Sequence, residues 1–112
     1  MLQPEIKNVE IIDNEVRLSL FVHDKMTYFK GHFPDFQLLP GVVQIHWAIK
    51  FAIKYLACTE AFESMDAIKF VKPLRPNTLV RLSIFKDTEK NTISYLYEGE
   101  QGKYSSGRVK FK

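Results

Sequence analysis

The alternation of hydrophobic and polar residues predicts two strands at the start of the chain. Residues 5–12 (EIKNVEII) and 15–22 (EVRLSLFV) flank the pair Asp13-Asn14. In residues 15–22 an apolar side chain occupies every second position, which is the period of a half-buried strand. Asp-Asn suits a tight turn, so we expect the two strands to be joined directly.

A long apolar segment in the middle of the chain predicts a helix. Residues 41–57 (GVVQIHWAIKFAIKYLA) contain no proline, and no glycine after the first position, and they are too many for one strand. At about 100° per residue, His46, Lys50 and Lys54 lie on one stripe, and nearly all other side chains are apolar. A helix with so narrow a polar stripe is expected to be covered on most sides by other structure. We therefore predict that it is the central helix of the domain.

The second half of the chain again has the pattern of strands. Four stretches, residues 64–72, 78–87, 91–99 and 103–112, are separated by the turn-rich joints PLRPN, TEK and EQG, which have hairpin length. The predicted order is two strands, one helix and four strands. This order indicates an α+β fold in which a strongly curved, mostly antiparallel sheet wraps around one long central helix. At 112 residues, positions 1–112 form a single domain.

The composition and net charge of the chain limit the kinds of molecule that it is expected to bind. Hydrophobic residues make up 46% of the chain and aromatic residues 13%, which supports a packed core and argues against disorder. The net charge of +3 is mild, and no run of Lys or Arg resembles a nucleic-acid-binding arm. Basic residues nevertheless gather mid-chain, where they would attract an acidic protein or a phosphate-bearing carrier unless they are simply solvated: Lys50, Lys54, Lys69, Lys72, Arg75 and Arg81.

The compartment is predicted from the N-terminal residues, the apolar segment and the cysteine count. The first ten residues lack the charged-then-apolar layout of a signal peptide. Residues 41–58 are too short and too polar to span a bilayer. The single cysteine, Cys58, cannot form an internal disulfide, and we expect it to be a small buried side chain and not a nucleophile. Together these features favour the cytoplasm.

Two motifs carry a resemblance to a known family. Gly31-His32-Phe33-Pro34 is followed after five residues by Pro40-Gly41-Val42, which opens the predicted helix. The pattern resembles that of the hot-dog-fold 3-hydroxyacyl-[acyl-carrier-protein] dehydratases. Residues 68–79 (IKFVKPLRPNTL) are similar to a second segment of that family, Lys-Phe-x-x-Pro-x-x-Pro. Residues 39–48 (LPGVVQIHWA) resemble most closely the aryl-polyene-type subgroup.

The resemblance implies an enzyme that dehydrates a 3-hydroxyacyl thioester on an acyl-carrier protein to the trans-2-enoyl thioester. Such enzymes serve fatty-acid or polyketide-like lipid synthesis, need no metal or organic cofactor, and act as homodimers or larger assemblies with shared active sites. His32 would be the base, since imidazole has a reference pKa of about 6.5. The backbone amides of Gly41 and Val42 would form the oxyanion hole at the helix start.

The chain departs from the family at the position of the helix carboxylate, where it has His46. As imidazolium His46 could donate a proton to the leaving hydroxyl, and as neutral imidazole it could orient a water molecule. Lys50, which replaces a frequent Gln, and Lys54 would disfavour the charged form if they lie close. In further departures, Gln37 replaces a proline, and Asn77 stands where the family has Gly-Asp in a longer turn.

The remaining site residues are expected to bind substrate. Phe33, Pro40 and Trp47 are expected to contact the substrate, although Trp47 with its apolar neighbours also has the pattern of a core residue. Lys72 and Arg75 would meet the phosphate of the carrier's pantetheine arm. No metal site is predicted, because no recognised metal spacing joins His32, Asp35 and His46.

Other interpretations stay open at this stage. A hot-dog thioesterase would use the same fold to activate water, and a catalytically silent acyl-binding or scaffold subunit would explain the missing helix carboxylate. Structural roles compete with the catalytic ones for His32 in a turn and for His46 on the exposed stripe. His23, an alternating strand residue, is expected to be structural.

Overall fold

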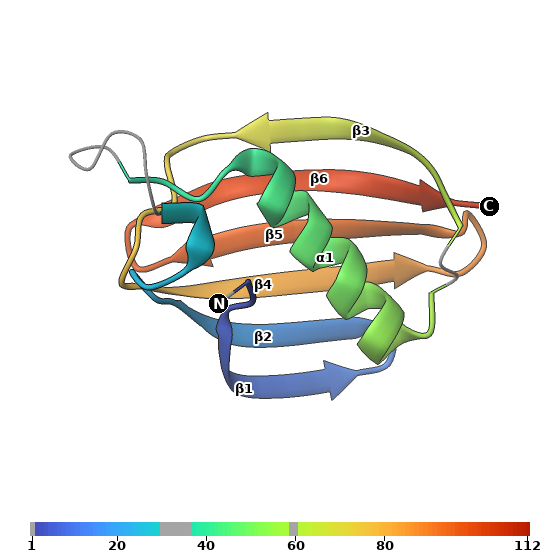
Figure 1. Cartoon of the computed structure of the whole chain (residues 1–112). Coiled ribbons are helices and arrows are strands. Elements are labelled where there is room, and N and C mark those ends of the chain that lie inside the picture. Colours follow the sequence, from blue (N-terminus) through green and yellow to red (C-terminus); the bar gives the residue numbers. More distant parts are fainter. Residues whose placement is uncertain (1, 30–36, 59–60) are drawn as a thin grey trace.

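The computed structural model describes residues 2–29, 37–58 and 61–112, and it has the predicted order of elements (Figure 1). Two strands, one helix and four strands follow one another as expected, and a short 3-10 helix, η1, is added in the polar break after the second strand. The elements are β1 (Glu5–Ile12), β2 (Glu15–Val22), η1 (Thr27–Phe29), α1 (Gly41–Leu56), β3 (Phe62–Phe70), β4 (Thr78–Asp87), β5 (Thr92–Gly99) and β6 (Gly102–Phe111).

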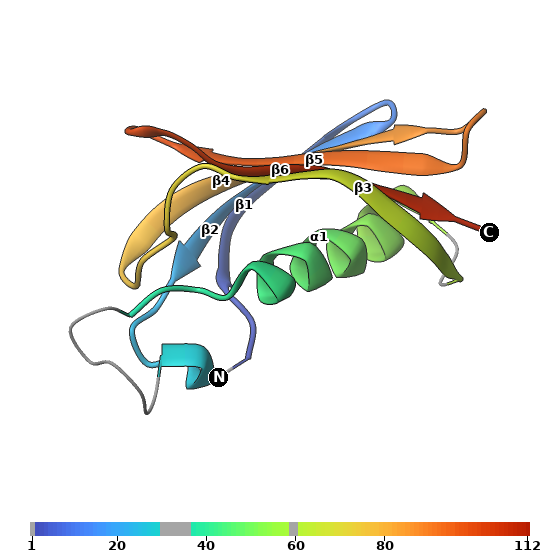
Figure 2. The same cartoon turned by 90° about the horizontal axis from the view of Figure 1, so that it is seen from above.

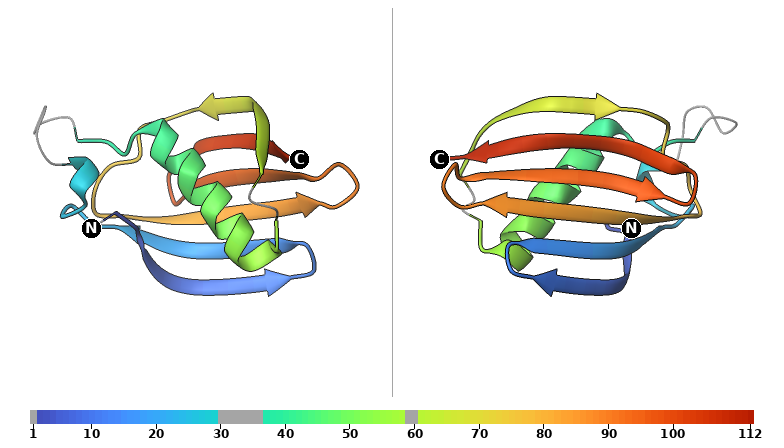
Figure 3. Two further views of the ribbon diagram at one scale, coloured as in Figure 1. Left: turned by 45° about the vertical axis from the view of Figure 1, so that its right-hand side comes forward. Right: turned by 180° about the vertical axis from the view of Figure 1, so that it is seen from behind.

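The strands form one antiparallel sheet in the order β1-β2-β4-β5-β6-β3. The sheet is curved, and α1 lies against its concave side (Figure 2). Seen from behind, the convex side of the described chain carries no helix (Figure 3). The predicted α+β class, with a curved sheet around one long helix, is confirmed.

The core lies between the concave side of the sheet and one side of α1. Alternate residues of the inner strands point toward the helix and are almost completely buried, because a strand places successive side chains on opposite faces. The buried strand residues include Val16, Leu18, Leu20, Val22, Val80, Leu82, Ile84, Ile93, Tyr95 and Tyr97. The helix contributes Val43, Trp47, Ala48, Phe51 and Ala52 to the same core.

The stripe predicted on α1 is confirmed, since His46, Lys50 and Lys54 are all exposed. Val42 lies on the same stripe and is 72% exposed. A large apolar side chain left in water at this position loses the stabilisation that burial would give. The side of α1 that faces away from the sheet is therefore uncovered in the single chain.

Hydrogen bonds hold both ends of α1, within the first turn at its start and from β4 at its end. At its start the backbone amides of Val43 and Gln44 donate to the carbonyl of Pro40, at 3.1 and 3.3 Å. At its end Lys86 of β4 donates through Nζ to the carbonyl of Leu56 at 3.1 Å. A cation at this end also favours the helix dipole, so Lys86 helps to hold the helix across the sheet.

Cys58 and His23 have the structural roles expected of them. Cys58 is buried, and burial raises the pKa of its thiol. His23 places Nε2 2.6 Å from Oε1 of Glu5. The pKa of Glu5 is lowered by its hydrogen bond to Lys7 and then by the bond to His23.

No helix in the described part of the chain is long and apolar enough to cross a membrane.

Candidate active site

The start of α1 presents backbone amides that no side chain within the described ranges caps. Leu39, two residues before Gly41, is held in place because its amide donates to the carbonyl of Leu74 at 2.7 Å. Pro40 has φ −57° and ψ 143°, which turns the chain directly into the helix, and no side chain of the described residues caps the first turn. Unpaired amides at a helix start favour a negatively charged oxygen. An oxyanion hole formed by the amides of Gly41 and Val42 stays a prediction, which this helix start allows.

Phe70, the last residue of β3, lies directly over Gly41. A Cβ atom at position 41 would overlap the ring of Phe70, with Cε1 only 2.6 Å away. A larger residue at position 41 would therefore displace the ring of Phe70, and glycine also leaves room for the approach of a ligand. Phe70 was not singled out as a site residue from the sequence, because its contact with Gly41 crosses from one element to another.

A groove of about 300 Å³ opens at this point, beside the helix start. Its lining combines the helix start, the end of β3 and the segment that follows β3: Leu38, Leu39, Gly41, Gln44, Phe70, Val71, Lys72 and Pro73. The lining is mainly apolar, so the groove suits an acyl group more than a polar ligand.

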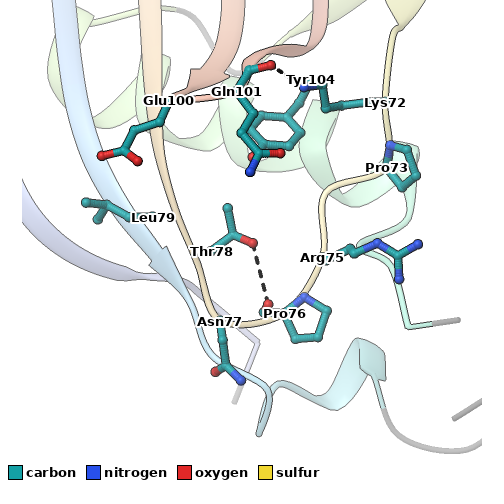
Figure 4. A pocket seen from close by; sticks show the side chains of 10 residues that line it. All are labelled: Lys72, Pro73, Arg75, Pro76, Asn77, Thr78, Leu79, Glu100, Gln101 and Tyr104. Atoms are coloured by element: carbon teal, nitrogen blue, oxygen red, sulfur yellow. Dashed lines mark hydrogen bonds between the residues drawn. The ribbon is translucent and has the colours of Figure 1, made fainter. Parts of the chain in front are cut away.

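A larger pocket of about 630 Å³ lies next to the groove, and Figure 4 shows the ten residues that line it. Lys72 and Pro73 line both cavities. Lys72 donates from Nζ to the carbonyl of Gln101 and lies 5.6 Å from the ring centre of Tyr104. Arg75 lines the same pocket, but its side chain points away from Gln101 and Tyr104 (Figure 4).

The polar side chains buried behind the helix start were missed in the sequence. Gln44 is 3% exposed and Ser105 is 1% exposed, and Ser105 donates from Oγ to Oε1 of Gln44 at 2.5 Å. Tyr97 donates its hydroxyl to the backbone carbonyl of Gln44 at 2.7 Å. A signal was present, because Gln44 lies about 200° from His46 around the helix, on the side where all its neighbours are apolar.

The structure brings together some of the predicted residues and separates others. Pro40, Gly41 and Val42 form the helix start, and Lys72 links the groove there to the pocket that Arg75 lines. His46 is exposed on the outer stripe of α1 and lines neither cavity in the single chain.

Three further predicted residues lie away from both cavities or outside the described ranges. Trp47 is 1% exposed, lines neither cavity, and donates from Nε1 to the carbonyl of Leu2 at 3.3 Å. His32 and Phe33 lie outside the described residues. Across residues 2–29, 37–58 and 61–112, no group of three His, Cys, Asp or Glu side chains is arranged to hold a metal ion.

A six-stranded antiparallel sheet curved around one helix, with a groove at the helix start, defines the hot-dog class of domains. The profile of the ApeI-like family, described as ApeI dehydratase, matches residues 8–108. The chain belongs to the ApeI-like dehydratase family. The resemblance to the aryl-polyene-type subgroup is thereby confirmed, and the chain has a dehydratase role.

Two solved structures are similar over nearly the whole chain. One is the dehydratase heterocomplex ApeI:P from Xenorhabdus doucetiae, with 33% sequence identity, 96% of each chain covered and a TM-score of 0.89. The other is an uncharacterized protein from Erwinia carotovora subsp. atroseptica, with 31% identity, coverage of 98% of this chain and 96% of that one, and a TM-score of 0.82. No curated protein sequence matches the chain.

Proposed function

We propose that the protein dehydrates a 3-hydroxyacyl thioester, carried on an acidic acyl-carrier protein, to the trans-2-enoyl thioester. The observation that carries the proposal is the start of α1, where Gly41 lines a mainly apolar groove and no side chain of the described residues caps the first turn, in a chain of a dehydratase family. We expect the reaction to take place in the cytoplasm, in fatty-acid or polyketide-like lipid synthesis.

The proposed reaction needs three kinds of group. His32 takes the proton from C2, and the electron pair of the C–H bond moves toward the thioester carbonyl. The developing oxyanion accepts hydrogen bonds from the amides of Gly41 and Val42. The pair then returns to form the C2–C3 double bond, while the C3 hydroxyl leaves as water after it receives a proton from His46 or from a water molecule that His46 orients.

The two cavities support a path for the carrier's arm. Lys72 and Pro73 line both the larger pocket and the groove. A pantetheine arm that enters the larger pocket would therefore reach the helix start by following the surface of the protein. The pantetheine phosphate would lie near Lys72 and Arg75, since a phosphate pairs well with cationic donors. Glu100 also lines this pocket, so the phosphate is expected on the side of the two basic residues.

We further propose that a second copy of the chain covers β3. This edge strand carries Phe62, Met65 and Phe70, each more than 40% exposed. Their register partners on β6 are Phe111, Val109 and Ser105, which are buried, so the three side chains belong to the concave side of the sheet. A second chain at this edge would continue the core and bring a second helix toward the first site. The Xenorhabdus doucetiae relative is a dehydratase heterocomplex, so a different chain is the competing partner at this edge.

The test of the proposal is incubation with a short 3-hydroxyacyl-carrier thioester, followed by mass spectrometry. Loss of one water from the acyl carrier is the expected result. Release of free carrier thiol would instead identify a thioesterase, and an unchanged acyl carrier over a series of chain lengths would favour a silent acyl-binding subunit.

Variants of the two histidines assign their roles. His32→Ala is expected to lower kcat by at least about 10²-fold, because no other base is proposed at C2. His46→Ala is expected to lower kcat by about 10-fold to 100-fold, and full activity would remove His46 from the mechanism. His46→Glu restores the acid of the wider family and is expected to retain or raise activity. His23→Ala, at a histidine outside the proposed site, is the matched control.

A further inference from the structure

Gln44 is a buried amide at a position where packing alone requires an apolar side chain. It lies in the first turn of α1 on the side facing the sheet, and Gln44 and Ser105 are the two buried polar side chains among the described residues, tyrosines aside. Burying an amide costs free energy unless its hydrogen bonds are satisfied, and a leucine of similar size would avoid that cost. The hydrogen bonds that the Gln44 side chain makes therefore indicate why a polar residue occupies this buried position.

The side chain of Gln44 connects the segment before the helix to the sheet. Its Nε2 donates to the carbonyl of Leu39 at 3.2 Å, and its Oε1 accepts from Oγ of Ser105 at 2.5 Å. The amide of Leu39 already donates to the carbonyl of Leu74 at 2.7 Å, so both peptide groups of Leu39 are held. Pro40, which follows, has a restricted φ and transmits this placement to Gly41.

The other end of the connection lies on β6, the strand between β5 and the edge strand β3. Ser105 of β6 is the register partner of Tyr97 on β5 and of Phe70 on β3. Tyr97 donates to the backbone carbonyl of Gln44 at 2.7 Å, and Phe70 covers Gly41. The helix start is thus fixed against three strands whose own positions are set by the sheet.

We infer that Gln44, held by Ser105, is a positioning residue that fixes the amides of Gly41 and Val42 in the direction needed to stabilise the thioester oxyanion. It acts through Leu39 and Pro40 and touches no reacting atom in this role. The inference rests on the proposed dehydratase chemistry at the helix start. Small displacements of catalytic groups can lower rates by up to about 10²-fold, so a fixed helix start is chemically significant.

The kinetic test compares Gln44→Leu with the wild-type protein on the same 3-hydroxyacyl-carrier thioester. We expect kcat to fall by about 10-fold to 100-fold while KM stays within about twofold, because the substrate still binds but the oxyanion is less well stabilised. Leu56→Ala, at the buried opposite end of α1, is the matched control, and its kcat should be unchanged. A folded Gln44→Leu variant with kcat within about twofold of the wild type overturns the inference.

A double variant separates positioning from stability. Replacing both partners of a buried hydrogen bond by apolar groups restores much of the stability lost by replacing one. Gln44→Leu with Ser105→Ala should therefore be more stable than Gln44→Leu alone, yet equally slow. Recovery of kcat together with stability would show that the pair is only structural. If Gln44→Leu does not fold, Ser105→Ala alone removes one bond and should give a smaller loss of kcat at unchanged KM.

Amide hydrogen exchange tests the same inference without any enzymatic reaction. Exchange at Leu39 and Val43 should become faster in Gln44→Leu and stay unchanged in Leu56→Ala. If the wild-type protein does not dehydrate the substrate but this exchange pattern is observed, the proposed function fails while the placement of the helix start by Gln44 holds. If exchange at Leu39 is unchanged in Gln44→Leu, the inference itself fails.

Discussion

Tyr95 and Tyr97 are neighbouring buried tyrosines of β5 whose hydroxyls differ in one respect. The hydroxyl of Tyr97 donates to the carbonyl of Gln44 at 2.7 Å, whereas that of Tyr95 has no hydrogen-bond partner among the described residues. A Cβ at Gly107 would lie 2.7 Å from the Tyr95 hydroxyl, so glycine at that position makes room for it. The two side chains therefore offer a matched comparison of a satisfied and an unsatisfied buried hydroxyl.

Replacing each of these tyrosines by phenylalanine is expected to have opposite effects on stability. Tyr95→Phe removes an unpaired buried hydroxyl and should raise the free energy of unfolding by about 1 kcal/mol. Tyr97→Phe removes a made hydrogen bond and should lower it by about 1 kcal/mol. Urea unfolding of the three proteins measures both changes. Equal losses in the two variants would show that the Tyr95 hydroxyl also has a partner.

The same pair gives a pH dependence. Burial raises the pKa of Tyr95 to about 12, from an ordinary value of 10.0, and raises that of Tyr97 as well. The unfolded chain therefore loses these protons at lower pH than the folded chain, so the free energy of unfolding falls as the pH rises from about 10 to about 12. Tyr95→Phe should make this fall less steep, which unfolding curves at about pH 9 and about pH 11 will show.

At the scale of elements, the edge strand β3 differs from the inner strands, whose concave-side residues are buried. The concave-side residues Phe62, Met65 and Phe70 of β3 are left uncovered, because α1 crosses the sheet diagonally and only its start approaches β3 (Figure 1). On the convex side, Arg108 of β6 donates to Asp66 at 2.9 and 2.6 Å and thereby lowers the pKa of Asp66. The apolar surface of β3 is thus confined to the side that a second chain would cover.

A charge on the concave side of β3 should separate the proposed dimer. Met65→Glu places a carboxylate on the apolar surface of this edge, and burying it in an interface would be costly. We expect the mass measured by light scattering to fall from dimer to monomer, with loss of dehydratase activity if the sites are shared. Ile11→Glu on β1, at a residue 52% exposed on the opposite edge, should leave the mass and the activity unchanged. A Met65→Glu variant that stays dimeric would place the interface elsewhere.

At the scale of the whole molecule, the two basic residues proposed to bind the carrier, Lys72 and Arg75, line one pocket. The pocket with Lys72 and Arg75 lies at the β5–β6 turn, whereas the β4–β5 turn with Lys90 lies at the opposite end (Figure 1). The proposed acidic carrier would approach the first end and place its arm at the groove beside the helix start. Attraction between such surfaces mainly affects association and weakens with salt.

Charge reversal at the two ends should therefore affect carrier recognition differently. Lys72→Glu is expected to raise KM for the carrier-bound substrate by about 10-fold, and to raise KM for a short pantetheine thioester that lacks the carrier by less. Lys90→Glu makes the same change in charge at the other end and should alter neither value. Equal increases for Lys72→Glu and Lys90→Glu would show that only the net charge of the molecule matters.

The sequence by itself determined the order and type of the elements. The strand at residues 15–22 and the helix from Gly41 follow from patterns among residues that are close in the sequence. Local periodicity is therefore sufficient to predict where these two elements lie. The boundaries of β1, β2 and β4 were predicted to the residue, whereas β3 begins and ends two residues before its predicted range. The exposed stripe of α1 and the membership of the dehydratase family were also predicted from the sequence.

Only the tertiary structure decided which residues surround the helix start. Phe70 covers Gly41, and Ser105 binds Gln44 across 61 positions of the chain. Lys72 joins the groove to the larger pocket because the segment after β3 passes the helix start. These contacts depend on how the sheet curves and on the register between strands, which local patterns do not specify. The helix start could therefore be predicted as a site from its motif, but what holds it in place became visible only in the folded chain.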